Sequence, residues 1–184
     1  MRMPPTDPLL PARVRLFLAL WPDDATRHAL QSLQQEISGR RSRPENLHLT
    51  LAFLGEQASE RVTPLTELLN AMPAFSSLLS IDVLGYFPGA RIAWAGMAQP
   101  DPALMQWQGV LRAELAARQF IGPRLETFRP HITLARDADK PPHAVRPMPI
   151  AWRANRVVLV QSDGGNGNPT VYRILAEGAR AAGA

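Results

Sequence analysis

The chain has 184 residues, a length that favours one domain or one domain built of two lobes. Apolar residues make up 46% and charged residues 20%, so a sizeable core is expected and whole-chain disorder is excluded. There is no cysteine, which excludes disulfide scaffolds, zinc–thiolate sites, iron–sulfur clusters and a cysteine nucleophile. The net charge is +4 and only Lys140 is a lysine. Arginine suits bidentate phosphate contact, which favours a phosphate-bearing partner, although genome base composition accounts for the same bias.

No apolar run approaches the roughly 20 residues that a membrane span needs. The first thirteen residues, MRMPPTDPLLPAR, carry prolines where a signal peptide needs an apolar segment. We therefore predict a disordered tail over 1–13, one domain over 14–178 and a short C-terminal tail over 179–184. A cytoplasmic protein, monomeric and not bound to a membrane, is expected.

The first half of the chain predicts two strands and two helices. VRLFLAL at 14–20 is typical of a buried strand, and Pro22 and Asp23 start a helix that reaches about Ser38. Residues 40–46 form a basic loop. LHLTLAFL at 47–54 predicts a strand that ends at Gly55, and Ser59 is the expected N-cap of a helix reaching about Asn70.

Residues 78–84 and 91–95 predict two strands joined by a turn at 86–89. Asp101 and Pro102 start the clearest helix, which runs to about Arg118.

Residues 130–135 predict another short strand, and 141–149 a proline-rich surface loop. Residues 156–160 and 170–176 predict a hairpin around the glycine-rich 163–168. Because the later strands arrive as hairpins, the pattern favours an α+β fold with antiparallel sheets.

One short word occurs twice, once in each half: His48-Leu49-Thr50-Leu51-Ala52 and His131-Ile132-Thr133-Leu134-Ala135. Successive side chains alternate between the faces of a strand, so each histidine shares a face with its threonine while the apolar residues point into the core. The repeat indicates an internal duplication in which two lobes each offer an equivalent strand to a common cleft.

Such a constellation suits displacement at phosphorus. One histidine can remove a proton from the nucleophile while the other protonates the leaving oxygen, and the threonine hydroxyls can donate to phosphate oxygens. No metal or other cofactor is needed. The alternatives are a purely structural role for each His-x-Thr word, and a zinc site made from the two histidines and His143. His28 is interpreted as a surface residue in mid-helix.

At these motifs the sequence resembles the two-histidine phosphoesterases, and among them the bacterial and archaeal RNA 2′,3′-cyclic phosphodiesterases once described as 2′-5′ RNA ligases. Nearly the whole chain takes part. The matching phrases are Arg15-Leu16-Phe17, Asn46 to Glu56, Gly85 to Pro88, Arg91 to Gly96, and Phe128 to Arg136.

The resemblance implies a bilobal fold of two pseudo-symmetric lobes, with opposed antiparallel sheets around a central cleft and helices outside. It also implies metal-independent hydrolysis of 2′,3′-cyclic phosphate ends of RNA or nucleotides to 2′-phosphomonoesters. By this resemblance His48 is the proton donor and His131 the proton acceptor, while Thr50 and Thr133 bind phosphate.

The resemblance further implies that Arg136 contacts the phosphate, although on an ideal strand its side chain faces away from His131, so the strand must end or bend there. Phe53 is a candidate base contact, but strand parity favours a core position for it. The arginines at 40, 41 and 43 either steer an RNA backbone or belong to an ordinary exposed loop.

Two rival functions remain open at this point. The first is an RNA-binding module that holds phosphate without chemistry. The second is the same fold acting on another cyclic or 2′-5′ phosphodiester.

Overall fold

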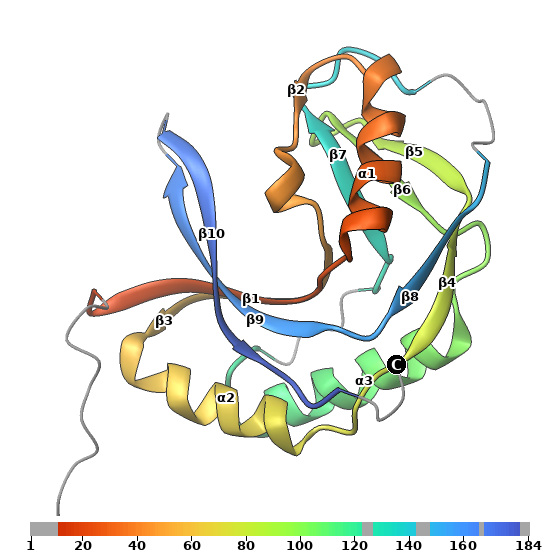
Figure 1. The fold of residues 1–184 in the computed structure, drawn as a ribbon. Helices are drawn as coiled ribbons and strands as arrows, with labels where there is room; N and C mark the ends of the chain where they lie inside the picture. Colours follow the sequence, from red (N-terminus) through yellow and green to blue (C-terminus); the bar gives the residue numbers. More distant parts are fainter. Residues whose placement is uncertain (1–10, 123–126, 143–147, 166–167, 181–184) are drawn as a thin grey trace, which may run out of the picture.

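The computed structural model describes residues 11–122, 127–142, 148–165 and 168–180. Most of the two predicted tails lies outside these residues. The middle of the predicted loop at 141–149 also lies outside them. The described part contains ten strands, three α-helices and three short 3-10 helices (Figure 1). The strands are β1 (Arg13–Leu20), β2 (Arg40–Arg41), β3 (Leu49–Ala58), β4 (Ser77–Ile81), β5 (Val83–Phe87), β6 (Ile92–Gly96), β7 (His131–Arg136), β8 (Ile150–Ala154), β9 (Val157–Gly165) and β10 (Asn168–Glu177). The helices are α1 (Asp24–Leu33), α2 (Val62–Ala71) and α3 (Pro102–Ala117), with 3-10 turns η1 (Gln34–Glu36), η2 (Pro44–Asn46) and η3 (Ser59–Arg61).

The strands form two antiparallel half-sheets that meet at one residue pair. The first half-sheet has the order β10-β9-β1-β3, and the second has the order β7-β6-β5 with β2 added to β7. Between them, β3 and β7 pair only at Leu49 and Ile132. A separate two-stranded sheet joins β4 to β8. The α+β class with antiparallel sheets is confirmed, and the two His-x-Thr words lie at the junction of the two halves.

The helices cover the outside of this arrangement (Figure 1). Helix α2 packs on β9 and β10, and α1 packs on β7 and β8. The main core lies between helices and sheets and includes Leu49, Leu51, Ile132 and Leu134, each no more than 2% exposed. Because these four apolar residues are buried, the histidines and threonines between them point to the opposite face, as alternation predicts.

Several predicted boundaries were wrong, each for a local reason. The strand predicted to end at Gly55 continues to Ala58, because Gly55 takes a positive φ of 67° and the chain stays paired with β1 through it. Ser59 does not cap α2. Its hydroxyl donates to the Pro11 carbonyl, and Ser59 is the first residue of the 3-10 turn η3, which precedes the helix.

The predicted strand over 78–84 is two strands in different sheets. Asp82 separates β4 from β5: its N–H donates to Gly96 O, and its carboxylate accepts from Ala98 N. The following turn begins at Phe87, later than predicted. Strands β2 and β8 were not predicted, whereas Asp101 caps α3 and the β9–β10 hairpin forms as predicted.

Each of the two repeated words contains a β-bulge at the same position. Against β1, the register of β3 passes from Thr50 to Ala52 and leaves Leu51 unpaired. Against β6, the register of β7 passes from Thr133 to Ala135 and leaves Leu134 unpaired. The burial pattern after each histidine is also the same: buried, half-buried, buried, buried, exposed. An extra residue reverses the alternation of side chains beyond it.

Candidate active site

The two histidines lie on the same face at the junction of the half-sheets. Because Leu49 pairs with Ile132 in antiparallel register, His48 comes next to Thr133 and Thr50 comes next to His131. All four side chains are half-buried. The duplicated strands therefore bring two imidazoles and two hydroxyls to one place, related by an approximate twofold axis through the pair.

Both imidazoles are held in the same way. Nδ1 of His48 lies 2.6 Å from Asn46 O, and Nδ1 of His131 lies 2.7 Å from Arg129 O. A carbonyl oxygen can only accept, so each Nδ1 carries a proton that it donates. In the neutral ring the other nitrogen, Nε2, is then the basic one. Nε2 of His48 lies 3.1 Å from Thr50 Oγ1, which donates to it in that state.

Three aromatic rings surround His48. Trp21 stacks on it with 5.6 Å between ring centroids, Phe17 lies at 4.9 Å, and Tyr172 meets it edge-on at 5.2 Å. The pKa of His48 is lowered from 6.5 to about 4, mainly by burial; the charges of Arg136 and His131 act in the same direction, and the Asn46 hydrogen bond opposes them. His48 is therefore neutral in the free protein at pH 7.

His131 lies in the second half-sheet, beside Phe87 at 5.0 Å and Trp94 at 6.2 Å. Burial lowers its pKa below 6.5, and the positive charge of Arg136 acts in the same direction, while the Arg129 hydrogen bond opposes both. The charge of Arg136 acts on both imidazoles, which places the three side chains in one electrostatic environment.

The bulge at Leu134 explains how Arg136 reaches this environment. The sequence predicted that the strand must end or bend at this point, and β7 does both: it bulges at Leu134 and ends at Arg136. Arg136 also influences the pKa of Tyr172, which burial raises and this cation lowers. Among the described residues, the positive charge of Arg136 lowers the pKa of all three groups: His48, His131 and Tyr172.

The preference for a core position of Phe53 was wrong. Its side chain is 72% exposed, because the bulge at Leu51 turns it to the face of His48 and Thr50. The ring centroid of Phe53 lies 6.5 Å from that of Phe17, which contacts His48. Phe53 and Arg136 are thus equivalent: each is the fifth residue after a motif histidine, and each follows a bulge.

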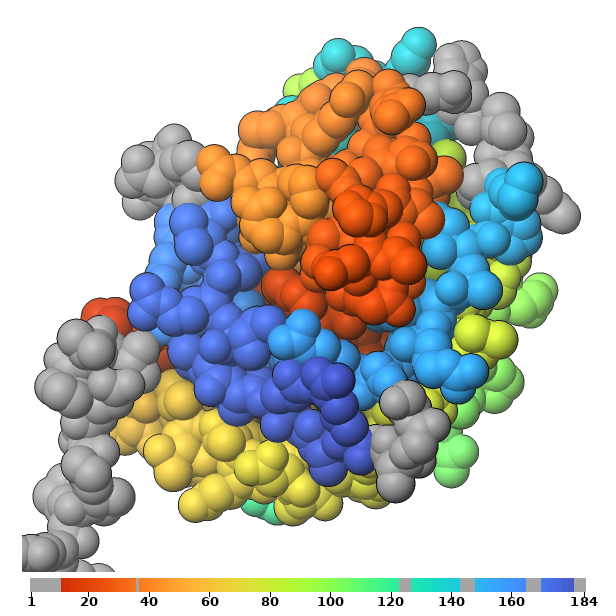
Figure 2. Space-filling model, viewed as in Figure 1, coloured from red at the N-terminus to blue at the C-terminus, as the bar shows by residue number. Residues whose placement is uncertain are grey.

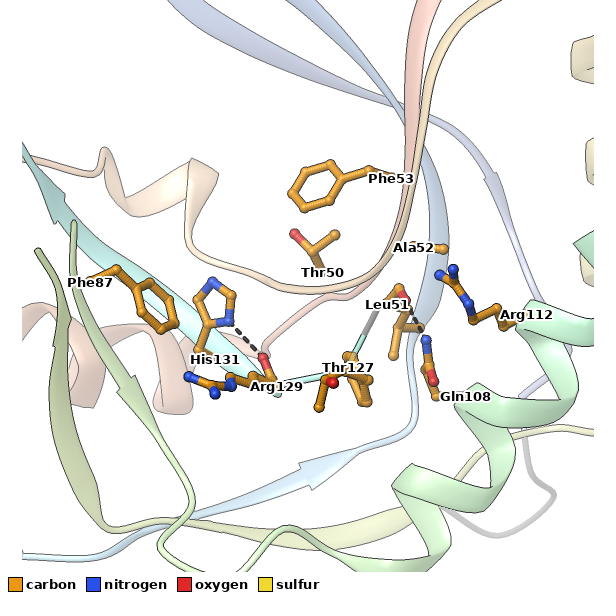
Figure 3. Close-up of a pocket in the computed structure, with 11 residues that line it drawn as sticks. Thr50, Leu51, Ala52, Phe53, Phe87, Gln108, Arg112, Thr127, Arg129 and His131 are labelled. Atoms are coloured by element: carbon orange, nitrogen blue, oxygen red, sulfur yellow. Dashed lines mark hydrogen bonds between the residues drawn. The ribbon is translucent and has the colours of Figure 1, made fainter. Parts of the chain in front are cut away.

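A pocket of about 280 Å³ opens where β3 and β7 diverge (Figure 3). Thr50, Phe53, Phe87 and His131 face this space from the two half-sheets. The other lining residues are Leu51, Ala52, Gln108, Arg112, Thr127, Phe128 and Arg129. The pocket combines aromatic faces, hydroxyls and cations beside a motif histidine, which is suitable for an anionic ligand with a planar ring.

The sequence patterns did not indicate Trp21, Tyr172 or Phe87 as residues of the site. The signal for Phe87 was its place within the phrase Gly85 to Pro88, and Trp21 directly follows the first predicted strand. Tyr172 carried no signal of its own, because its proximity to His48 depends on how β10 joins the sheet through β9.

In Figure 2 the residues of η2 lie against those of β10, and Asn46 Nδ2 donates to Thr170 O there at 3.0 Å.

The basic loop is partly a strand and each of its arginines has a contact. Arg40 lies 3.2 Å from the carboxylate of Asp137, Arg41 donates to Gln35 O, and Arg43 lies 4.0 Å from Glu45. Arg40 pairs through its backbone with Arg136, so this segment supports β7.

His28 is exposed on α1, as predicted, and His143 lies outside the described residues. Within the described residues no group of three or more His, Asp or Glu side chains is placed to hold a metal ion. No helix in the described part of the chain is long and apolar enough to cross a membrane.

Comparisons with known proteins agree on one group. The model of the 2'-5' RNA ligase superfamily matches residues 21–166. A protein of Escherichia coli (strain K12) named RNA 2',3'-cyclic phosphodiesterase is 37% identical over 131 residues, which cover 71% of this chain and 69% of the relative. A protein of the same name from Archaeoglobus fulgidus is 30% identical over 136 residues, covering 70% of this chain and 76% of the relative.

Solved structures give the same picture. The crystal structure of E. coli LigT in apo form is similar with a TM-score of 0.78 and 31% identity, covering 91% of this chain and 97% of LigT. The structure of LigT complexed with 3'-AMP matches with a TM-score of 0.77, covering 90% of this chain and 97% of that one.

Proposed function

The chain belongs to the 2'-5' RNA ligase superfamily, and from this premise we propose that it is an RNA 2′,3′-cyclic phosphodiesterase. It opens 2′,3′-cyclic phosphate ends of RNA or nucleotides to 2′-phosphomonoesters without a metal ion. The observation that carries the proposal is the pair of imidazoles on one face, each with Nδ1 donating to a backbone carbonyl, so that Nε2 is the nitrogen that exchanges a proton. Two such groups supply the base and the acid that the reaction needs.

In the proposed reaction a water molecule attacks phosphorus as Nε2 of His131 takes one of its protons. The bond between phosphorus and the 3′-oxygen breaks, and Nε2 of His48 gives that oxygen a proton. The product has a 2′-phosphate and a 3′-hydroxyl, so one water molecule has been added. Afterwards a proton passes from His131 to His48 through solvent to restore the starting state.

The assignment of His48 as acid requires it to carry a proton in the complex. In the free protein its pKa of about 4 leaves roughly one molecule in a thousand protonated at pH 7. A bound phosphodiester brings a negative charge, which raises the pKa of a neighbouring imidazole. We therefore place the protonation of His48 after substrate binding.

Binding is assigned to three kinds of group. Thr50 and Thr133 donate hydroxyl hydrogen bonds to phosphate oxygens, and Arg136 contributes positive charge. Phe53, exposed on the rim of the pocket, offers its ring to the base. A monomer in the cytoplasm acting on RNA ends or cyclic nucleotides completes the proposal.

The test is incubation with a panel of 2′,3′-cyclic nucleotides and an RNA ending in a cyclic phosphate, all with excess EDTA. We expect 2′-phosphomonoester products, identified by chromatography against both isomers. H48A and H131A should each lower kcat by about 100- to 10,000-fold, while H28A, which alters an exposed histidine, should leave it unchanged. Unaltered substrates with retained binding would favour a phosphate-binding module instead. Turnover of other diesters alone would favour the same fold with a different substrate.

The two roles can be separated with a phosphodiester whose leaving group is p-nitrophenolate. Such a group departs without protonation, so H48A should retain activity on this substrate while H131A does not. The reverse order would exchange the roles of the two histidines.

A further inference from the structure

Two buried glutamines contact the two repeated words at the same point. Gln34, at the end of α1, donates from Nε2 to Leu134 O at 2.7 Å and is 5% exposed. Gln108, in α3, donates from Nε2 to Leu51 O at 3.0 Å and is 6% exposed. Leu51 and Leu134 are the bulged residues, each the third after its histidine. Figure 3 shows this bond between Gln108 and Leu51, both of which line the pocket.

The bulges decide which side chains face the cleft. In a strand without the extra residue, the fifth residue after each histidine would lie on the core side. With it, Phe53 and Arg136 are exposed while Ala52 and Ala135 are buried. A bulge interrupts the regular ladder, and a buried carbonyl needs a partner at such a place.

From this we propose that Gln34 and Gln108 are positioning residues that fix the two bulges and thereby direct Arg136 and Phe53 into the cleft. The effect of the glutamines on substrate binding rests on the proposed function. Their effect on the two bulges does not depend on it. Neither glutamine needs to touch the reacting atoms, since each acts through the carbonyl that it holds.

Gln34 belongs to a hydrogen-bond network that holds the backbone of the second motif. Its Nε2 also donates to Ser42 O at 2.9 Å, while Ser42 N donates to Leu134 O at 2.8 Å. The Ser42 hydroxyl donates to Thr133 O at 2.8 Å. Two successive carbonyls of the second motif are therefore held from one side, which restricts where the chain can bend before Arg136. Leaving such buried groups unpaired is costly, so the arrangement is expected to be well defined.

The test uses Q34M and Q108M, which keep the side-chain length and remove the donors. We expect Q34M to weaken the binding of inorganic phosphate and to raise KM about tenfold with a smaller change in kcat, because Arg136 is displaced. Q108M should raise KM for a purine cyclic nucleotide by a similar factor through Phe53. Each effect on KM should largely disappear when the side chain that the glutamine positions is already absent. The KM of the double variant Q34M/R136Q should therefore be close to that of R136Q, and the KM of Q108M/F53A close to that of F53A.

Q161M is the matched control. Gln161 is also buried, at 3% exposed, but its Nε2 donates to the Asp163 carboxylate and not to a motif carbonyl. We expect this variant to lose stability without the shift in KM. If a methionine variant does not fold, Q34L or Q108L replaces it, since leucine also lacks a donor and places no charge at the buried site.

Full additivity with R136Q and F53A, or unchanged KM and phosphate affinity in folded variants, would overturn the positioning role. Phosphate affinity, measured by calorimetry, does not require turnover. A wild-type protein that binds phosphate but turns over no cyclic nucleotide would therefore refute the proposed function while leaving the test of Gln34 intact.

Discussion

The indole of Trp21 lies nearly parallel to the imidazole of His48, with 12° between the ring planes. The stacked ring excludes water from one face of the imidazole and leaves Nδ1 and Nε2, which lie in the ring plane, able to hydrogen-bond. The same contact that holds His48 in place therefore also makes its charged form unfavourable.

Replacing Trp21 by alanine should raise the pKa of His48 from about 4 towards its usual value, because water then reaches the ring. The measurement is an NMR titration of the histidine Cε1–H signals. We expect kcat/KM to fall about tenfold, since a mobile imidazole loses its orientation.

Trp107 provides the control, because its indole lies beside Phe75 and donates to Pro73 O, whereas the indole of Trp21 stacks on His48. W107A should lower stability without moving the His48 titration. An unchanged His48 pKa in W21A would mean that Phe17 and Tyr172 suffice for the desolvation.

Stability should rise with pH between about 4 and 6.5. In this window the unfolded chain binds a proton at His48 that the folded chain excludes, so the free energy of unfolding increases as the pH rises. The gap from 6.5 to about 4 corresponds to roughly 3 kcal/mol between pH 7 and pH 3.5, with His131 adding in the same direction. Urea unfolding at several pH values measures it.

H48Q should flatten this pH dependence by most of that amount. A pH dependence that H48Q retains in full would show that other groups cause it.

Removing the charge of Arg136 should affect binding and titration together. R136Q takes away a cation that lowers the pKa of both His48 and His131, so both pKa values should rise. Loss of one phosphate contact should raise KM by about 10-fold.

Arg153 on β8 is a matched exposed arginine, and its strand belongs to the separate two-stranded sheet. R153Q should change neither KM nor the histidine titrations. If R136Q leaves both pKa values where they are, Arg136 does not share the environment of the imidazoles in solution.

Truncating Phe53 should weaken base binding with little cost in stability. The ring is 72% exposed, so F53A removes little buried area. Loss of base stacking, worth about 1–3 kcal/mol, should raise KM roughly 5- to 150-fold for purine cyclic nucleotides and less for pyrimidines.

Leu78 on β4 is also largely exposed, at 63%, and lies outside the pocket. L78A should leave KM unchanged. Equal KM values for F53A and the wild type with every base would remove Phe53 from the base-binding surface.

Sequence patterns predicted the two motif strands, the helix capped by Asp101 and the face shared by His48 with Thr50 and by His131 with Thr133. These features depend on neighbours close in the chain: apolar alternation for the strands, and a carboxylate three residues before an N–H for the cap, at 2.7 Å. The repeat itself pointed to a shared cleft, because two equivalent strands can meet about an axis.

The errors came from contacts between distant parts of the chain. Strand β8 was not predicted because its partner, β4, is far away in sequence, and the division of β4 from β5 at Asp82 depends on Gly96 and Ala98. Tyr172 and Trp21 reach His48 only when the strands that carry them are assembled side by side.

What the sequence determined by itself was therefore the chemical groups and the face on which each His-x-Thr word presents them. The orientation of Phe53 and Arg136, by contrast, depends on the assembled fold, since strict alternation would place both towards the core. The bulges at Leu51 and Leu134 reverse that alternation, and they depend on which strand lies opposite and on which amide is near the carbonyl. Such partners come from other elements of the fold, and no local pattern of the motif specifies them.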